Sequence, residues 1–197
     1  MALKLIDLSQ EIFQGMSVFP MHQKTFIMTN MTHEENMEMT GSPTVGFSAR
    51  NLLLSEHCGT HSDGVSEFKP GGPTVDKMPL EHFWGSAICI DVSHVRYPNY
   101  IEPKDLEEAL RKSGQEIKNG DIVLLYTGHH DRTFGTDKFQ TDYTGLSYEG
   151  AKWLAEQGVM NIGVDAPAID LTPDDIDFSG HLVCGEYNIT NTENLCN

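Results

Sequence analysis

The segment from residue 57 to residue 67 constrains this chain most strongly, because it concentrates metal-ligand side chains where a continuous helix is disfavoured. Its sequence is HCGTHSDGVSE. Gly59 and Gly64 interrupt the segment, which favours a strand that runs into a tight loop. Alternate side chains of an extended stretch share a face, so the odd-numbered residues can point the same way and Cys58 the other. Because imidazoles and carboxylates bind first-row metals, the pattern predicts three or four ligands on one face, with Cys58 as a packing residue. The odd-numbered positions are His57, Gly59, His61, Asp63 and Glu67.

A pair of histidines four positions apart is by itself a weak signal, because such pairs occur by chance on the surfaces of many soluble proteins. Here a carboxylate, Asp63, follows two residues after His61. The segment also comes directly after an apolar run at residues 52–54 and is bounded by glycine. These features favour a metal site over a chance pair.

Length and charge limit the possible partners. A chain of 197 residues is long enough for one domain with a substantial core, so we expect a single domain over residues 1–197. The formal net charge is -16, which disfavours nucleic acid and anionic membranes because both repel an acidic surface over roughly 8–10 Å. No apolar run approaches the ~18 residues of a membrane-spanning helix. We therefore expect a small-molecule substrate, with no nucleic-acid or membrane partner.

The start of the chain and its cysteines both favour the cytoplasm. Asp7 comes too early for the apolar part of a secretory signal. The four cysteines form no C-x-x-C pair and no regular framework, which favours reduced thiols over disulfides. They are Cys58, Cys89, Cys184 and Cys196.

The pattern along the chain predicts a mixed α/β or α+β domain with more strands than helices. Strand-like runs occupy residues 3–8, 45–55, 87–92, 122–126, 160–164 and 182–189. One helix is expected from Pro103 to just before Gly114, and another from Ser147, as N-cap, to Gly158. Residues 29–43 and 69–73 are the candidate mobile loops, and either could act as a lid.

Two separated blocks resemble the metal-dependent cyclase family, which includes the bacterial kynurenine formamidases and isatin hydrolases. HCGTHSD at residues 57–63 resembles the family signature H-x-G-T-H-x-D. A second block resembles the family's closing motif, in which a His is followed by Glu-Asn-Leu. Here the block consists of His181 and, after the same interval as in the family, Glu193-Asn194-Leu195. Shorter matches are IDLS at residues 6–9, VFP at 18–20, LYTG at 125–128 and GVDAP at 163–167. The resemblance implies a single α/β domain with the swivelling β/β/α fold, rich in strands with a few helices.

The same resemblance implies a ligand set. His57, His61 and Asp63 would bind a first metal, while Asp63 and Glu193 would bridge to a second. His181 would complete the second site. Carboxylates can bridge two cations, although one metal might suffice chemically. Nitrogen and oxygen ligands without a thiolate suit Zn or Mn about equally, so one or two such divalent ions per subunit are expected.

Glu67 departs from the family pattern. The pattern continues with a proline and a final histidine, where this chain has Val65 and Glu67. In the kynurenine formamidases that histidine is taken as the proton-transfer residue. A carboxylate beside a metal can also transfer protons, so Glu67 is the candidate catalytic residue as general base. The alternatives are an extra metal ligand or a solvated loop acid.

Other candidate site residues have less support. Phe19 precedes Pro20 where the formamidases place a substrate-contacting aromatic; the alternative is a core phenylalanine. His129 and His130 follow a predicted strand and could line the pocket or form a surface pair. Asp165 could orient a metal ligand or stabilise a turn.

These residues lead to a functional hypothesis. We expect a metal-dependent amidohydrolase that uses a metal-activated water on a non-peptide C–N bond: an amide, imide, lactam or N-formyl group. The alternatives are lactone or ester hydrolysis, a cyclisation, or a metal-binding protein without turnover. Kinship implies a homodimer or homotetramer.

Overall fold

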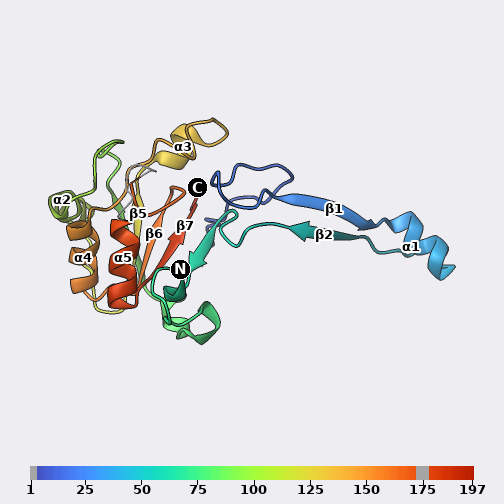
Figure 1. Ribbon diagram of the computed structural model, residues 1–197, viewed down its shortest axis with the longest axis horizontal. Helices are drawn as coiled ribbons and strands as arrows, with labels where there is room; N and C mark the ends of the chain where they lie inside the picture. The colour runs from blue at the N-terminus through green and yellow to red at the C-terminus, as the bar shows by residue number, and fades with distance from the viewer. Residues whose placement is uncertain (1–3, 172–177) are drawn as a thin grey trace. The chain divides into compact units, whose positions relative to one another are not determined.

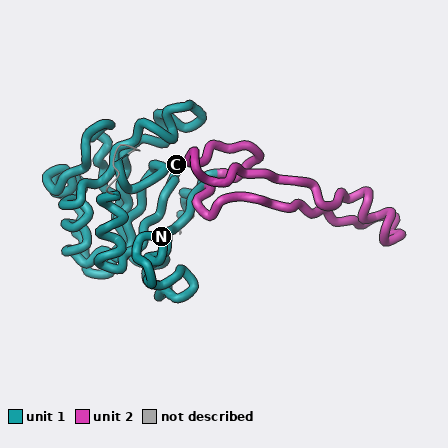
Figure 2. The backbone as a smooth tube through the Cα atoms, viewed as in Figure 1, with its two compact units in different colours: residues 1–10, 59–197 teal, residues 11–58 magenta. Residues whose placement is uncertain are grey.

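The computed structural model describes residues 4–171 and 178–197 (Figure 1). It separates into two compact units (Figure 2). The described residues within 1–10 and 59–197 form the first unit, and residues 11–58 form the second. The expectation of one domain over residues 1–197 stays a prediction, and each unit is described by itself below.

The first unit is built on a five-stranded sheet of order β3-β7-β6-β5-β4. Strands β4 to β7 are parallel to their neighbours, and β3 pairs antiparallel with β7 at one edge. Apolar residues at alternate positions explain the burial: in β4, Ile88 and Ile90 are buried while Cys89 between them is exposed. The strands are β3 His61–Asp63, β4 Ala87–Asp91, β5 Ile122–Tyr126, β6 Asn161–Val164 and β7 Thr190–Glu193.

Three helices cover one face of this sheet, as Figure 1 shows. Helix α2 starts with Pro103 and stops at Gly114, whose φ of 66° suits glycine at a helix end. Ser147 caps α4 by accepting the N–H of Gly150. Apolar side chains of these helices pack on the inward residues of β4, β5 and β6 to form the core. The helices are α2 Pro103–Ser113, α4 Tyr148–Glu156 and α5 Ser179–Tyr187; the short α3, His129–Thr133, follows β5.

The opposite face of the sheet, here called the open face, carries the outward side chains of the same strands. Cys89 and Leu124 belong to it, because their neighbours along the chain are in the core. A Cβ on Gly163 would approach the side chains of Leu124 and Leu195 at 2.5 and 2.8 Å. Leu195, just after β7, therefore packs on the open face. The segment between β3 and β4 forms three 3₁₀ helices: η1 Val65–Glu67, η2 Val75–Lys77 and η3 Leu80–His82.

The second unit is a two-stranded antiparallel ribbon with a helix between its strands. β1, Phe26–Met31, pairs with β2, Ala49–Leu53. The helix α1, His33–Thr40, begins with a capping box in which Thr32 and Glu35 accept each other's backbone N–H. Gly41 ends it at a φ of 68°.

Four of the six predicted strands are confirmed: those at residues 45–55, 87–92, 122–126 and 160–164 each contain an observed strand. Both predicted helices are confirmed as well. Seven strands and five α-helices occur within residues 4–171 and 178–197.

The strand predicted at residues 182–189 is wrong, because most of this segment belongs to α5. A short buried apolar run has no period of its own that separates helix from strand. The strand at residues 3–8 is also wrong over residues 4–8, which form no strand; Leu3 lies outside the described residues. Residues 29–43 are not a loop, because they contain the end of β1 and all of α1. Residues 69–73 are irregular, as predicted.

The backbone of the motif also differs from the expected strand followed by a loop. Residues 57–60 form turns, and the strand comes after them as β3. Residues 65–67 then form η1, so the alternation that would align Glu67 with Asp63 ends after β3. In the part of the chain that the structure describes, no helix has the length and apolar character needed to cross a bilayer.

Candidate metal centre

Three buried side chains from three elements converge in the first unit: Asp63 of β3, His181 of α5 and Glu193 of β7. Each offers a ligand atom, and the three atoms lie within 4.8 Å of one another. His181 Nε2 is 3.1 Å from Glu193 Oε1 and 3.7 Å from Asp63 Oδ2. The two blocks of the sequence, more than a hundred residues apart, thus meet in one cluster.

The register of β3 against β7 explains this convergence. His61 lies opposite Glu193, and Asp63 lies opposite Asn191. Because directly opposed residues point to the same face of a sheet, all four side chains share one face. His61 Nε2 is 3.3 Å from Asp63 Oδ1 and 3.6 Å from Glu193 Oε2. The sequence prediction that His61 and Asp63 share a face is confirmed within β3.

The ring of His61 is oriented by its own backbone. Its Nδ1 lies 2.8 Å from the carbonyl oxygen of Gly59, which directs Nε2 toward the carboxylates. Gly59 has a φ of 68°, a conformation that glycine adopts without strain. Burial lowers the pKa of His61, but the hydrogen bond to Asp63 and the charges of Glu193 and Asp63 outweigh it and raise that pKa to about 9.

Asp170 orients His181. One carboxylate oxygen of Asp170 accepts the backbone N–H groups of Gly180 and His181 at 2.7 and 3.2 Å, at the start of α5. Its other oxygen contacts His181 Nδ1. This contact leaves Nε2 directed at Glu193 and Asp63, an arrangement typical of carboxylates that support metal-ligating histidines. Burial lowers the pKa of His181, but Asp170 outweighs it and the pKa lies well above its ordinary value.

Asn191 lies among the three convergent side chains. Its side-chain amide donates to Asp63 Oδ2 at 2.6 Å and to Glu193 Oε1 at 2.9 Å, and it lies 3.1 Å from His181 Nε2. The same Glu193 oxygen also accepts the backbone N–H of Ile169 at 3.1 Å. Each of these atoms is thereby held in place around a common centre.

The donor set fits a divalent cation. Three buried carboxylates, Asp63, Asp170 and Glu193, meet two imidazoles, and the raised pKa values of His61 and His181 show that this cluster attracts positive charge. Oxygen and nitrogen donors without a thiolate suit Zn or Mn. The geometry supports a divalent metal, while the assignment of individual ligands stays a prediction.

Glu67 is placed at the end of η1 and is exposed to solvent. It is not one of the convergent ligand residues among the described part of the chain. The next residue, Phe68, packs its ring on that of His181, with 3.9 Å between the ring centroids. These observations leave the proposed proton-transfer role of Glu67 untested.

Two predicted site residues, Phe19 and His57, belong to the second unit. Phe19 is partly buried, so it is not a fully buried core residue. Its ring centroid is 5.4 Å from that of His22, whose ring is 4.8 Å from that of His57. The structure thus brings together Phe19 and His57 with His22, a histidine to which the sequence pattern assigns no role.

The remaining candidates lie elsewhere in the first unit. Asp165 Oδ1 accepts both the N–H and the hydroxyl of Thr127, at 2.8 and 2.6 Å, so it stabilises the turn after β5. Asp170, rather than Asp165, contacts a predicted ligand.

His129 is buried and lies 2.8 Å from the carbonyl oxygen of Phe139, so the surface-pair alternative is wrong for this residue. Burial lowers the pKa of His129. Sequence analysis missed Asp170 and Asn191; strand alternation from Glu193 could have indicated Asn191.

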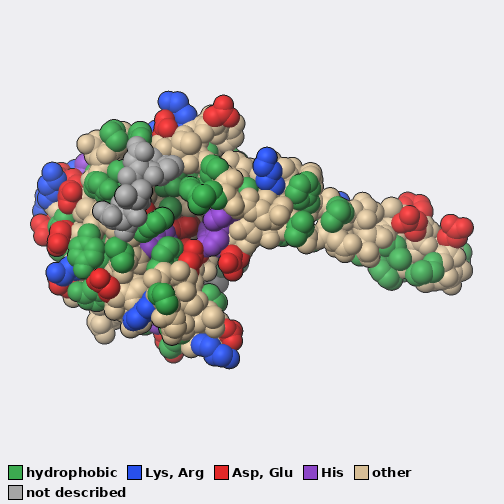
Figure 3. All heavy atoms as spheres, in the orientation of Figure 1, with side chains coloured by type: hydrophobic (Ala, Val, Ile, Leu, Met, Phe, Trp, Pro, Cys, Tyr) green, Lys and Arg blue, Asp and Glu red, His purple; other side chains and the backbone are tan. Residues whose placement is uncertain are grey.

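The expected absence of nucleic-acid binding stays a prediction. On the face shown in Figure 3, Lys and Arg side chains are scattered and do not gather in one patch. Acidic side chains outnumber basic ones in the chain by 29 to 13.

Comparison with known proteins gives sequence relatives of this chain. Kynurenine formamidase of Bacillus cereus is 28% identical over 190 residues, which cover 96% of this chain and 81% of the relative. Kynurenine formamidase of Bordetella petrii is 26% identical over 167 residues, which cover 85% of this chain and 71% of the relative.

The solved structures give the fold. Isatin hydrolase A from Labrenzia aggregata superposes with a TM-score of 0.80 at 20% identity, covering 98% of this chain and 80% of that one. Isatin hydrolase A from Ralstonia solanacearum gives a TM-score of 0.78 at 21% identity, covering 98% and 79%. The α/β fold expected from the sequence resemblance is confirmed. The model of the family described as "Putative cyclase" matches residues 6–171. Because that match spans most of the chain, the protein belongs to the cyclase family.

Proposed function

We propose that this protein is a metal-dependent hydrolase of a non-peptide C–N bond in a small molecule, such as an amide, imide, lactam or N-formyl group. The observation that carries the proposal is the buried convergence of Asp63, His181 and Glu193 on one centre. The similarity to kynurenine formamidases and isatin hydrolases supports this bond class. A cluster of buried carboxylates and imidazoles on a scaffold shared with hydrolases is the kind of site that such chemistry requires.

One or two divalent ions, Zn or Mn, would be held by the convergent residues. We assign His61, Asp63, His181 and Glu193 to this role from their contacts in the first unit. His57 joins them on the sequence resemblance. When bound, a divalent cation lowers the pKa of coordinated water to about 7 and polarises a substrate carbonyl.

The residues around the ligands would position them and move protons. Asp170 keeps Nε2 of His181 directed at the cluster. Glu67, in the family's position for proton transfer, would act as general base or, alternatively, as an additional ligand. Phe19 would offer an aromatic surface to a planar substrate, beside His22 in the second unit.

The test begins with the metal content of purified protein, followed by hydrolysis assays with N-formyl aromatics, isatin, cyclic imides and lactones. We expect a divalent metal in stoichiometric amount and turnover of at least one C–N substrate that chelation abolishes and metal restores. Turnover confined to lactones or esters would favour the alternative hydrolase. Bound metal without turnover of any substrate would favour a metal-binding protein.

The role of Glu67 is tested with Glu67→Ala and Glu67→His. Loss of turnover with full metal content identifies a proton-transfer residue, and we expect histidine to restore part of the rate. Loss of metal identifies a ligand. Glu81→Ala removes an exposed acid from η3 and is the matched control, which should keep both metal and activity.

Location and assembly are further proposals. We place the protein in the cytoplasm as a homodimer or homotetramer, on its free cysteines and the family resemblance. Light scattering of purified protein measures the assembly, and a monomer at micromolar concentration would contradict it.

A further inference from the structure

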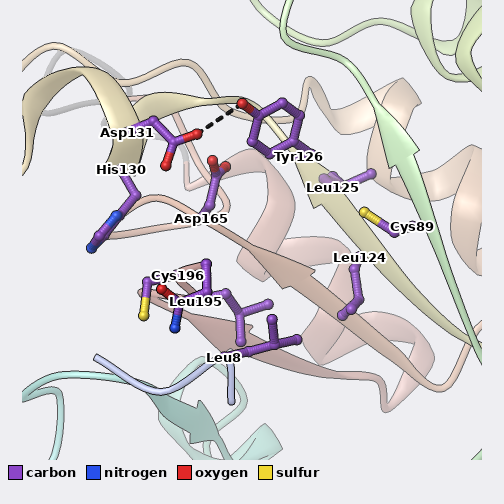
Figure 4. A pocket seen from close by; sticks show the side chains of 11 residues that line it. Leu8, Cys89, Leu124, Leu125, Tyr126, His130, Asp131, Asp165, Leu195 and Cys196 are labelled. Atoms are coloured by element: carbon purple, nitrogen blue, oxygen red, sulfur yellow. Dashed lines mark hydrogen bonds between the residues drawn. The ribbon is translucent and has the colours of Figure 1, made fainter. Parts of the chain in front are cut away.

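A pocket on the open face of the sheet lies apart from the residues assigned to the metal centre. Figure 4 shows two leucines of β5, Leu124 and Leu125, with Leu8 and Leu195 from outside the strands, and acidic and aromatic groups at one end. None of the residues assigned to the metal lines it. All of its lining residues belong to the first unit: Leu8, Cys89, Leu124, Leu125, Tyr126, His130, Asp131, Asp165, Leu195, Cys196 and Asn197.

Asp165 is the polar group that makes this pocket more than an apolar depression. Its side chain lines the pocket although the residue is only 8% exposed. One oxygen is used by Thr127, but the other, Oδ2, is buried and has no hydrogen-bond partner. A buried acceptor without a donor destabilises the fold, and more so when it is charged, so a ligand that supplies the donor binds more tightly.

His130 supplies a second acceptor. Its Nε2 is also buried without a partner in the structure, and its ring lines the same pocket. The ring is held by stacking on Phe134, with centroids 4.5 Å apart, and its backbone N–H donates to the carbonyl oxygen of Asp165 at 3.0 Å. In the tautomer that carries its proton on Nδ1, Nε2 is an acceptor, and the pocket then offers two acceptors to a ligand with more than one N–H group.

The carboxylates that line the pocket are negatively charged groups. Asp131 lines it beside Asp165, and Tyr126 donates its hydroxyl to Asp131 at 2.9 Å. No lysine or arginine lines it among the described residues. The nearby guanidinium groups of Arg96 and Arg132 both donate to the carbonyl oxygen of Thr127. The leucines supply an apolar wall for the rest of a ligand.

We infer that this pocket binds a primary ammonium group carried on a short apolar stem. The ammonium would donate to Asp165 Oδ2 and His130 Nε2, and the stem would lie against Leu8, Leu124 and Leu195. A carboxylate or phosphate ligand is disfavoured because it would add acceptors and negative charge where both are already in excess. This inference is independent of the proposed hydrolase function.

Calorimetric titration of the full chain with n-butylammonium tests the inference, with butyrate and n-butanol as the anionic and neutral comparisons. We expect saturable binding of the ammonium alone. Nα-acetyl-lysinamide, which carries the same group on a peptide-like stem, distinguishes a protein-borne lysine from a free amine. Absence of saturable binding of both ammonium compounds, or equal binding of butyrate or butanol, overturns the proposal.

Asp165→Asn locates the site. The side-chain oxygen of the asparagine keeps the hydrogen bonds from Thr127. Its NH2 group takes the place of Oδ2, so a donor replaces the unpaired acceptor. We expect the affinity for butylammonium to fall by about tenfold or more, because a hydrogen bond to a charged group is lost. Leu124→Trp should block the pocket by filling it. Asp137→Asn removes one exposed acid outside the pocket and is the matched control.

Thermal unfolding of each variant shows whether it is folded, and the binding comparison uses folded variants. Unchanged binding in both Asp165→Asn and Leu124→Trp overturns the assignment. Because binding is read without any hydrolysis assay, failure here and failure of the proposed function can be told apart.

Discussion

The metal centre and the open-face pocket both contain buried carboxylates, but the partners of the carboxylate oxygens differ between the two sites. In the metal centre, carboxylate oxygens converge with imidazole nitrogens, and Asn191 donates to two of the acids. In the pocket, Oδ2 of Asp165 is buried without a hydrogen-bond partner. Several convergent lone pairs favour a compact multivalent cation, whereas a few acceptors that do not converge with other ligands, beside leucines, suit a monovalent organic cation. Carboxylate number and convergence therefore separate the two sites better than burial does.

The strongest way to break this comparison is to remove a convergent acid. Glu193→Gln should reduce the rate of hydrolysis on the order of a thousandfold. The substitution removes a charge that would hold the metal, and the bound metal would stabilise the transition state by several kcal/mol. Metal content and kcat/KM are the measurements. Butylammonium binding should be unchanged. Glu156→Gln removes an exposed acid from α4 and is the matched control. Full metal content and activity in Glu193→Gln would contradict the ligand assignment.

Asp170→Asn should have a smaller effect, because Asp170 acts through His181. Asparagine keeps the acceptor for the α5 backbone N–H groups but loses the charged partner of His181 Nδ1. We expect a 10- to 100-fold loss of metal affinity, in the range of about 10–100-fold for partners of metal-ligating histidines. Metal titration measures it directly. Unchanged affinity with reduced stability would indicate a purely structural role.

The pH dependence of the metal-free protein sharpens the electrostatic side of the comparison. The pKa of His61 in the folded state, about 9, lies above its ordinary value of 6.5. Its stabilising contribution is therefore complete below pH 6.5 and is lost as pH rises through about 9. Urea unfolding of wild type and His61→Gln should show a difference in unfolding free energy that shrinks between about pH 6 and about pH 10. A difference in unfolding free energy that stays constant with pH would contradict the raised pKa of His61 as its cause.

The smallest expected effect concerns Asp131, which is exposed and reaches the pocket from α3. Asp131→Asn should weaken butylammonium binding only about two- to fivefold, because solvent screens an exposed charge. Titration calorimetry of both variants, Asp131→Asn and Asp165→Asn, shows which one loses more affinity for butylammonium. A larger loss in Asp131→Asn than in Asp165→Asn would show that Asp131, and not Asp165, is the main anionic partner.

Sequence alone predicted the parts of the fold whose signals are local. The helix at α2 was indicated by Pro103 and Gly114, and β5 by its apolar run. The strand assigned to residues 182–189 failed, since α5 is held by tertiary burial and by Asp170 at its start. The capping box at Thr32 was present in the sequence and would have indicated α1.

The site followed the same rule. His61 and Asp63 could be predicted because they share a short strand, and the pairing with Glu193 followed from the resemblance. Asp170 and Asn191 were missed, because their roles depend on contacts across the fold rather than on a spacing within one segment. The orphaned oxygen of Asp165 has no sequence signature at all.

The strand order places β7, which comes after β3 and β6 in the sequence, between these two strands. A nascent chain emerging from the ribosome thus carries His61 and Asp63 long before Glu193 exists to face them. During that interval β3 has no sheet neighbour of its own, since it pairs with β7 alone among the described strands. Acquisition of the metal would then depend on the insertion of β7 between β3 and β6.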